Sequence, residues 1–253
     1  MGESLAHRTR IAGDPNRAGR TPARDRRLSA AALRTLSPVA LAAFNHLISG
    51  ALAALAVATP AAAERPPVRW DAIPYGTQRR SDMKAYANRH YGIDSYRLTR
   101  PKVIVEHMTE GSTFQAARNT FAPNVRDGEL GELPGVCSHF VIDTGGRIHQ
   151  LVPLGLMCRH TVGLNWTAIG IEHVGFSESG VMANTKMRQA SLRLTNWLRC
   201  RFGITQSNVI GHNESLSSPY HRERVARLRT QTHSDWPTAK MRPYRAALRK
   251  LSC

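Results

Sequence analysis

Two histidines lie where short apolar runs of the sequence end. His107 lies where the run 103–105 gives way to polar residues, and His212 directly follows the run 209–211. Side chains at strand ends and in loops can converge on one cleft. If the two histidines bind a metal ion there, a third ligand could come from the loop segment 233–235, His-Ser-Asp. Two imidazoles and one carboxylate leave a fourth position open for water, as a catalytic zinc requires.

An acidic residue, Glu172, ends another apolar run at 168–172. We expect burial to raise the pKa of a carboxylate there, which suits it to take a proton from an activated water. A structural interpretation stays open, since strand-end histidines often only form hydrogen bonds, Asp235 could cap the last helix and Glu172 could pair with an arginine. No H-E-x-x-H motif is present, and His173 is expected on the opposite face of its strand from Glu172.

The residues that could do this chemistry need a scaffold of alternating strands and helices. Turn residues 143–146 between 139–142 and 148–152 predict a hairpin, and Asn184 and Gly203 bound a long helix. Further predicted elements are helices opened by Ser81, by Ser112 and by Pro237, and strands at 103–105, 168–174 and 209–210. The expected fold is a single α/β domain with a mixed central β-sheet flanked by helices.

The first quarter of the chain has the pattern of an export signal. An arginine-rich segment precedes an uncharged, Ala- and Leu-rich stretch at 35–63 that ends in three alanines, with cleavage expected after Ala63. The pair Arg26-Arg27 fits a twin-arginine signal, and a membrane anchor is the alternative. We therefore divide the chain into an export signal at 1–63, a helical extension at 64–100 packed on the domain, and a catalytic domain at 101–253.

The net charge of +17 on 253 residues first suggests a nucleic-acid partner. The 30 arginines and five lysines are scattered, however, and we recognise no nucleic-acid-binding motif in a chain that we expect to be exported. Residues 64–253 keep 27 basic and 15 acidic residues, which favours attraction to a polyanionic cell wall.

All four cysteines lie after the expected cleavage site, where disulfides are permissible. Of the three possible pairings we favour Cys137–Cys158 and Cys200–Cys253, with buried free thiols as the alternative. No C-x-x-C motif supports a redox or thiolate zinc site.

Seven segments in fixed order carry a resemblance to a known family. They are Ile104 to Thr109, Ser138 to Asp143 with its Gly145-Gly146 turn, Gln150 to Pro153, His160 to Asn165, Ile169 to Glu172, Gly211 to Glu214, and Thr232 to Pro237. In this order they resemble the type 2 zinc-dependent N-acetylmuramoyl-L-alanine amidases, which share a fold with phage amidase lysozymes and peptidoglycan recognition proteins. The resemblance implies hydrolysis of the amide between the muramoyl lactyl group and L-alanine in peptidoglycan.

The resemblance also implies roles for single residues. His107, His212 and Asp235 match the zinc ligands, and Glu172 matches the acidic catalytic residue that moves the proton. His233 stands where many members have a lysine that stabilises the oxyanion, and it is also the alternative third ligand, with Asp235 orienting it.

Four further residues are expected near the substrate. His139 and His160 match positions near the cleft, for substrate contact or packing, and Asn165 and Trp166 could contact sugar or peptide. Zn²⁺ is the expected cofactor and peptidoglycan or a muropeptide the expected partner, with no nucleic acid, no stable membrane insertion after cleavage and a monomeric state. The alternative functions are a non-catalytic peptidoglycan-binding module on the same fold and an exported zinc peptidase that cuts within the stem peptide.

Overall fold

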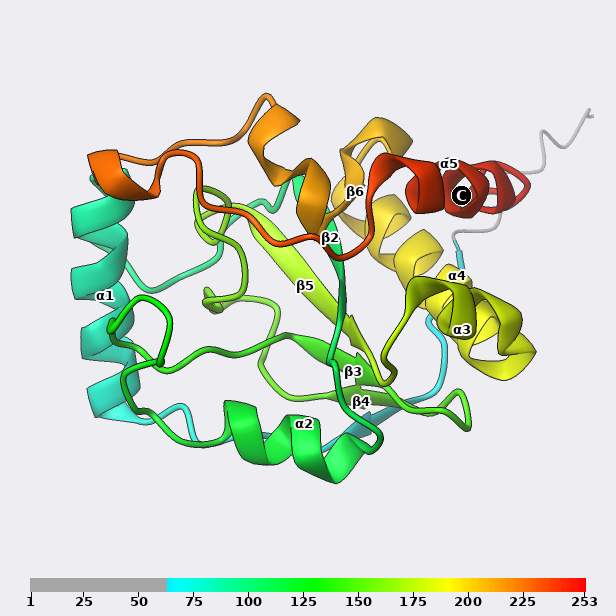
Figure 1. Ribbon diagram of the computed structural model, residues 1–253, viewed down its shortest axis with the longest axis horizontal. Helices are drawn as coiled ribbons and strands as arrows, with labels where there is room; N and C mark the ends of the chain where they lie inside the picture. The colour runs from blue at the N-terminus through cyan, green and yellow to red at the C-terminus, as the bar shows by residue number, and fades with distance from the viewer. Residues whose placement is uncertain (1–62) are drawn as a thin grey trace, which may run out of the picture. The chain divides into compact units, whose positions relative to one another are not determined.

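The structure, a computed structural model, describes residues 63–253, and the expected export signal lies outside these residues apart from Ala63. In the described part a six-stranded sheet has the strand order β1-β4-β3-β5-β2-β6 (Figure 1). The strands are β1 (Val68–Trp70), β2 (Val103–Met108), β3 (Phe140–Ile142), β4 (Ile148–Gln150), β5 (Ala168–His173) and β6 (Val209–Gly211). Only the β3–β4 pair is antiparallel, so the sheet is mixed, as expected.

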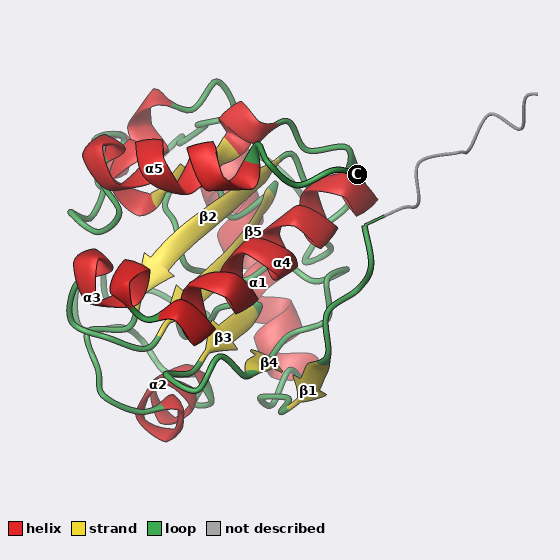
Figure 2. Ribbon diagram, turned by 90° about the vertical axis from the view of Figure 1, so that its right-hand side faces the viewer, coloured by secondary structure: helices red, strands yellow, loops and turns green. Residues whose placement is uncertain are grey.

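Helices cover both sides of this sheet. They are α1 (Thr77–Tyr91), α2 (Phe114–Phe121), α3 (Glu178–Ala183), α4 (Thr185–Phe202) and α5 (Thr238–Leu248). Helices α3, α4 and α5 lie on one face and α1 lies behind the other (Figures 1 and 2). None of the helices in residues 63–253 is long and apolar enough to cross a membrane.

Local capping signals set the ends of the helices. The side chain of Asn184 accepts the backbone N–H of Met187 at the start of α4, and Gly203 ends the helix at φ 63°, both as predicted. Helix α1 begins at Thr77, earlier than Ser81, because Gly76 is its N-cap. The cap of α2 is Thr113, one residue after the predicted Ser112. Strand β1 and helix α3 were not predicted, although Ser177 caps α3 by accepting a hydrogen bond from the backbone N–H of Gly180.

The predicted hairpin is present as β3 and β4. Its turn closes where the N–H of Gly146 donates to the carbonyl of Asp143, and Gly146 takes a φ of 80° that favours glycine. Strand β1 pairs with β4, so part of the predicted extension at 64–100 belongs to the central sheet.

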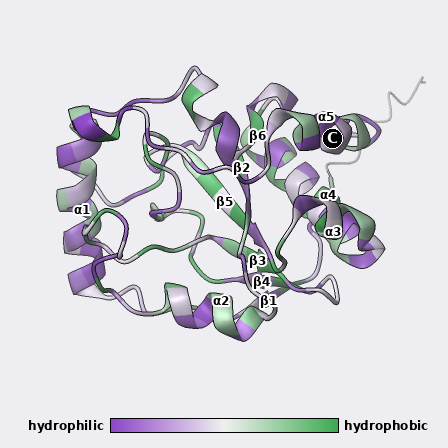
Figure 3. Ribbon diagram, in the orientation of Figure 1, coloured by the Kyte–Doolittle hydropathy of each residue, from purple (hydrophilic) through white to green (hydrophobic). Residues whose placement is uncertain are grey.

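The core lies between the sheet and the helices. Strands β2 and β5 are buried along almost their whole length, and β5 is hydrophobic in Figure 3 whereas α1 is mostly hydrophilic. The predicted disulfides Cys137–Cys158 and Cys200–Cys253 both form, and the second ties the C-terminus to α4. The three strands β2, β5 and β6 are thus buried up to the ends at which His107, Glu172 and Gly211 lie.

Candidate active site and metal centre

The site forms where three adjacent parallel strands end. Strand β2 lies between β5 and β6, and its His107 is in register with Glu172 of β5. Glu106 is in register with Gly211 of β6, so His212 follows one step beyond the paired residues. Because the strands are parallel, all three side chains meet at the same edge of the sheet.

His107, His212 and Asp235 form a compact group of ligand atoms. Asp235 places Oδ2 3.7 Å from Nδ1 of His107 and Oδ1 3.3 Å from Nδ1 of His212. One ligand atom from each residue lies within 4.8 Å of the other two. Two imidazoles and one carboxylate are the donor set of a catalytic zinc, and the spacing fits one ion. His233 lies outside this group, which favours Asp235 as the third ligand.

Three hydrogen bonds hold Asp235 and the residue that follows it: one to the side chain of Asp235 and two to the backbone. The N–H of Met108 donates to Asp235 Oδ2 at 3.3 Å, and the N–H of Asn213 donates to the Asp235 carbonyl at 2.9 Å. The next residue, Trp236, is fully buried at φ 52°, and its N–H donates to Glu178 of α3 at 2.8 Å. A positive φ is strained for a tryptophan, so the surrounding contacts impose this conformation.

The ring of His107 is oriented by groups on its far side. Its Nε2 lies 3.0 Å from Nδ1 of His160 and 3.3 Å from the hydroxyl of Thr161, which leaves Nδ1 to face Asp235. Burial, together with the nearby His212 and His160, holds the pKa of His107 well below its usual range. The imidazole is therefore neutral, as metal ligation requires.

Glu172 is a buried carboxylate with an unused oxygen. It lines a cleft of about 180 Å³ together with the three candidate ligands. Its Oε2 is buried and has no hydrogen-bond partner. Burial, and then the nearby Asp235 and Glu110, raise the pKa of Glu172 to about 8. Such a group can accept and release a proton near neutral pH.

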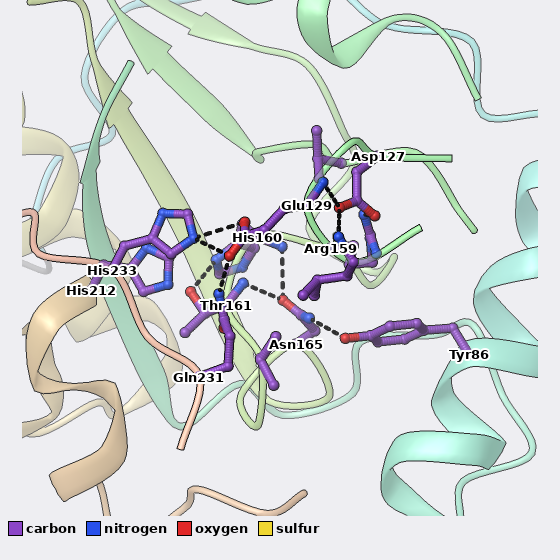
Figure 4. A pocket seen from close by; sticks show the side chains of 13 residues that line it. Tyr86, Asp127, Glu129, Arg159, His160, Thr161, Asn165, His212, Gln231 and His233 are labelled. Atoms are coloured by element: carbon purple, nitrogen blue, oxygen red, sulfur yellow. Dashed lines mark hydrogen bonds and ion pairs between the residues drawn. The ribbon is translucent and has the colours of Figure 1, made fainter. Parts of the chain in front are cut away.

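His233 lies at the mouth of the cleft. Its ring stacks on that of His212 with centroids 4.6 Å apart and 14° between the planes. Its Nε2 lies 3.1 Å from Oε2 of Glu129, a pair that Figure 4 shows across the pocket. Nearly half of the His233 side chain is exposed, so it can meet a bound substrate.

The other predicted substrate residues serve first to shape the loop after His160. Asn165 is fully buried: its Oδ1 accepts the N–H groups of His160 and Thr161, and its Nδ2 donates to Tyr86 (Figure 4). The indole of Trp166 donates to the Gly163 carbonyl.

His139 is wholly internal. Its Nε2 lies 3.0 Å from the Leu156 carbonyl, and its Nδ1 accepts the N–H of Gly170. Burial lowers its pKa to about 4. Substrate contact by His139, His160, Asn165 or Trp166 stays a prediction.

Sequence reasoning missed several residues of the pocket beside the cleft. Arg159, Asp127, Glu129 and Tyr86 line this pocket. The position of Arg159 directly before His160 was the one available signal, but it could not distinguish this arginine from the other 29.

The family model of the N-acetylmuramoyl-L-alanine amidases matches residues 97–239, more than half of the chain. The chain belongs to this family. It is therefore an amidase that hydrolyses the bond between N-acetylmuramic acid and L-alanine, and its substrate is peptidoglycan or a muropeptide.

Solved structures of low identity are also similar to this amidase. An endolysin amidase from Clostridium intestinale is 18% identical, with 60% of this chain and 84% of that chain covered and a TM-score of 0.42. A mutant endolysin from Bacillus subtilis is 20% identical, with 72% and 98% covered and a TM-score of 0.45. The amidase AmiD from E. coli, in complex with anhydro-N-acetylmuramic acid-L-Ala-D-gamma-Glu-L-Lys, is 24% identical, with 46% and 49% covered and a TM-score of 0.37. No curated protein matches the chain.

Proposed function

We propose that the amidase is zinc-dependent, with His107, His212 and Asp235 as metal ligands and Glu172 as the catalytic acid and base. The observation that carries this proposal is the convergence of two histidines and one carboxylate beside a buried carboxylate that has an unpartnered oxygen. When bound, zinc polarises the scissile carbonyl and acidifies a water molecule.

The residues of the chain divide the proton transfers and charge stabilisation between them. Glu172, buried in the cleft beside the candidate metal ligands, takes a proton from the attacking water and delivers it to the leaving nitrogen of L-alanine. His233, exposed at the cleft mouth and backed by Glu129, donates a hydrogen bond to the oxyanion. His160 and Thr161 keep the ring of His107 in one orientation throughout.

The proposal is tested by metal analysis and product identification on purified muropeptide. The protein should contain one zinc ion per chain, lose activity with a chelator, and expose the amino group of L-alanine in the product. A new amine elsewhere in the stem would indicate the peptidase alternative, and binding without any product would indicate a binding module.

Glu172→Gln tests the catalytic role directly. We expect the variant to keep its zinc and to lose about 100-fold or more in kcat, the usual contribution of a general acid and base. Asp94→Asn removes the same charge from an exposed position and serves as the control. Near-normal turnover in Glu172→Gln would remove this residue from the mechanism.

We further propose that the amidase is exported and acts at the cell wall. The two disulfides support export, since disulfides persist in oxidising compartments. N-terminal sequencing of protein recovered outside the cytoplasm should begin at Glu64. An intact N-terminus in the membrane fraction would instead support the anchor.

A further inference from the structure

Arg159 is a buried arginine with unused hydrogen-bond donors. Its side chain is 4% exposed, and Asp127 pairs with its Nη2. The Nε and Nη1 atoms are buried and have no partner. Three of the five N–H bonds of a guanidinium are on these two atoms. Buried polar groups are almost always satisfied, so these donors indicate a missing acceptor.

Arg159 lies on a wall shared by two hollows. It lines the cleft that contains Glu172 and the candidate metal ligands. It also lines the neighbouring pocket beyond His160, where Figure 4 shows it directly beside Asp127. A substrate whose scissile bond lies at Glu172 can therefore extend toward Arg159.

The two acids near Arg159 are already engaged within the protein. Asp127 also accepts the backbone N–H groups of Glu129, Leu130 and Glu132. Burial alone would raise the pKa of Asp127, but these hydrogen bonds and the charge of Arg159 bring it below its ordinary value. Glu129 is shared between His233 and Gln231. Neither acid reaches Nε or Nη1 of the guanidinium.

The contacts around Arg159 also set the orientation of its guanidinium group. Its Cζ lies 5.7 Å from the ring centroid of Tyr86, and the Tyr86 hydroxyl accepts a hydrogen bond from Asn165. Asn165 in turn holds the N–H groups of His160 and Thr161. The loop that carries Arg159 is thus fixed before substrate binds, which favours specific recognition.

From these contacts we propose that Arg159 is a substrate-binding residue that recognises the free α-carboxylate of a γ-linked D-glutamate, the first residue of the stem peptide after L-alanine. This rests on the proposed function of the neighbouring cleft. A γ-linked D-glutamate, the residue that follows L-alanine in the peptide bound to AmiD, keeps its α-carboxylate free. A charged guanidinium binds such a carboxylate more strongly than a neutral carbonyl.

The test uses two muramoyl tripeptides that differ at one group. Both end in L-lysine with an amidated C-terminus, so that the D-glutamate carries the sole carboxyl group of the peptide. In one the α-carboxyl of the γ-linked D-glutamate is free, and in the other it is amidated. We expect the wild-type enzyme to favour the free carboxylate by roughly 10- to 100-fold in kcat/KM, the contribution of hydrogen bonds between charged groups. Arg159→Gln should lose this preference, mainly by slowing hydrolysis of the carboxylate substrate, and Arg159→Lys should keep part of it.

Arg193→Gln, on the exposed side of α4, is the matched control and should keep the wild-type ratio. Equal hydrolysis of both tripeptides by the wild-type enzyme, or an unchanged ratio in a folded Arg159→Gln, would overturn the proposal. Equal hydrolysis by the wild-type enzyme overturns the proposal even where Arg159→Gln fails to fold, and Arg159→Lys then supplies the second variant. Failure of the proposed function is distinct, because then neither tripeptide would release the muramoyl group.

Discussion

At the scale of single residues, the site contains two carboxylates in different surroundings. Asp235 accepts a backbone N–H and faces two imidazole nitrogens, whereas Oε2 of Glu172 has no donor at all. A carboxylate that faces two imidazole nitrogens is placed to share a metal ion with them, whereas burial without donors raises the pKa of Glu172 and lets it hold a proton more readily. The surroundings of the two side chains thus separate ligation from proton transfer.

This difference predicts distinct effects for the two candidates for third ligand. Asp235→Ala removes an atom from the ligand group and should empty the metal site, with activity falling by 100-fold or more. His233→Ala should keep the metal and lose about 100- to 1,000-fold in kcat, because it removes one donor to the oxyanion. Zinc per chain, measured on both purified variants, checks the assignment. An empty site in His233→Ala with full zinc in Asp235→Ala would reverse it.

At the scale of elements, the end of β6 touches the backbone of the segment 235–236. A Cβ at Gly211 would clash with the carbonyl oxygen of Trp236. Glycine is therefore required here for a close approach, although its φ of −84° is ordinary. This contact brings His212, on one side of it, next to Asp235 on the other.

Gly211→Ala should consequently damage both stability and metal binding. We expect a loss of about 2–3 kcal/mol in the free energy of unfolding, as for other overpacked sites, and a weaker affinity for zinc. Gly155→Ala is the control, since a Cβ there meets nothing within 4 Å. Denaturant unfolding of the metal-free proteins, with a separate zinc titration, distinguishes the two effects. Wild-type stability in Gly211→Ala would show that the segment shifts freely.

The elements also show what the sequence could predict. Asn184, Gly203 and the 143–146 turn act on their own neighbours, so the helix and hairpin that they bound were predicted correctly. Strand β1 is three residues long and is defined by its pairing with β4, which lies about 80 positions away. No local pattern encodes such a pairing, and this is why β1 was missed.

The same distinction between local and long-range signals explains which residues of the site were predicted and which were missed. His107, Glu172 and His212 were predicted together because each follows an apolar run, and parallel strands bring their ends to one edge. Arg159 and Glu129 lie in loops whose course depends on contacts such as those of Asp127 with the backbone. Their proximity to the cleft follows only from the folded chain.

At the scale of the whole molecule, buried histidines between paired acids join segments that are distant in sequence. His90 of α1 lies 2.7 Å from Glu132 and 2.9 Å from Glu223, and all three side chains are buried. His149 of β4 contacts Asp71 and Asp143 in the same way. The first group links α1 to the two loops that also carry Glu129 and His233.

The His90 group predicts a pH dependence of stability. Burial alone would lower the pKa of His90, but hydrogen bonds and charges from Glu132 and Glu223 raise it above its ordinary value. A raised pKa means that the stabilisation is complete below about pH 6.5 and is lost as the pH rises through the folded-state pKa. Burial alone would raise the pKa of Glu132, but hydrogen bonds and charges from His90 and Arg89 lower it to about 2. The stabilisation that ionised Glu132 provides is therefore lost only in acid.

His90→Gln therefore should destabilise the protein most near pH 5.5, by about 3 kcal/mol as for a buried ion pair that loses one partner, and progressively less toward pH 9. The other buried histidines are present in both proteins, so the difference between wild type and variant reports His90 together with the two carboxylates that it contacts. Arg89→Gln removes a half-exposed partner of Glu132 and should cost 1 kcal/mol or less. Denaturant unfolding of all three proteins between pH 5 and 9 provides the measurement. If the difference in the free energy of unfolding between wild type and His90→Gln stays constant over this range, His90 is held neutral. Its contacts with the two loops would then depend on packing and hydrogen bonding and not on its charge.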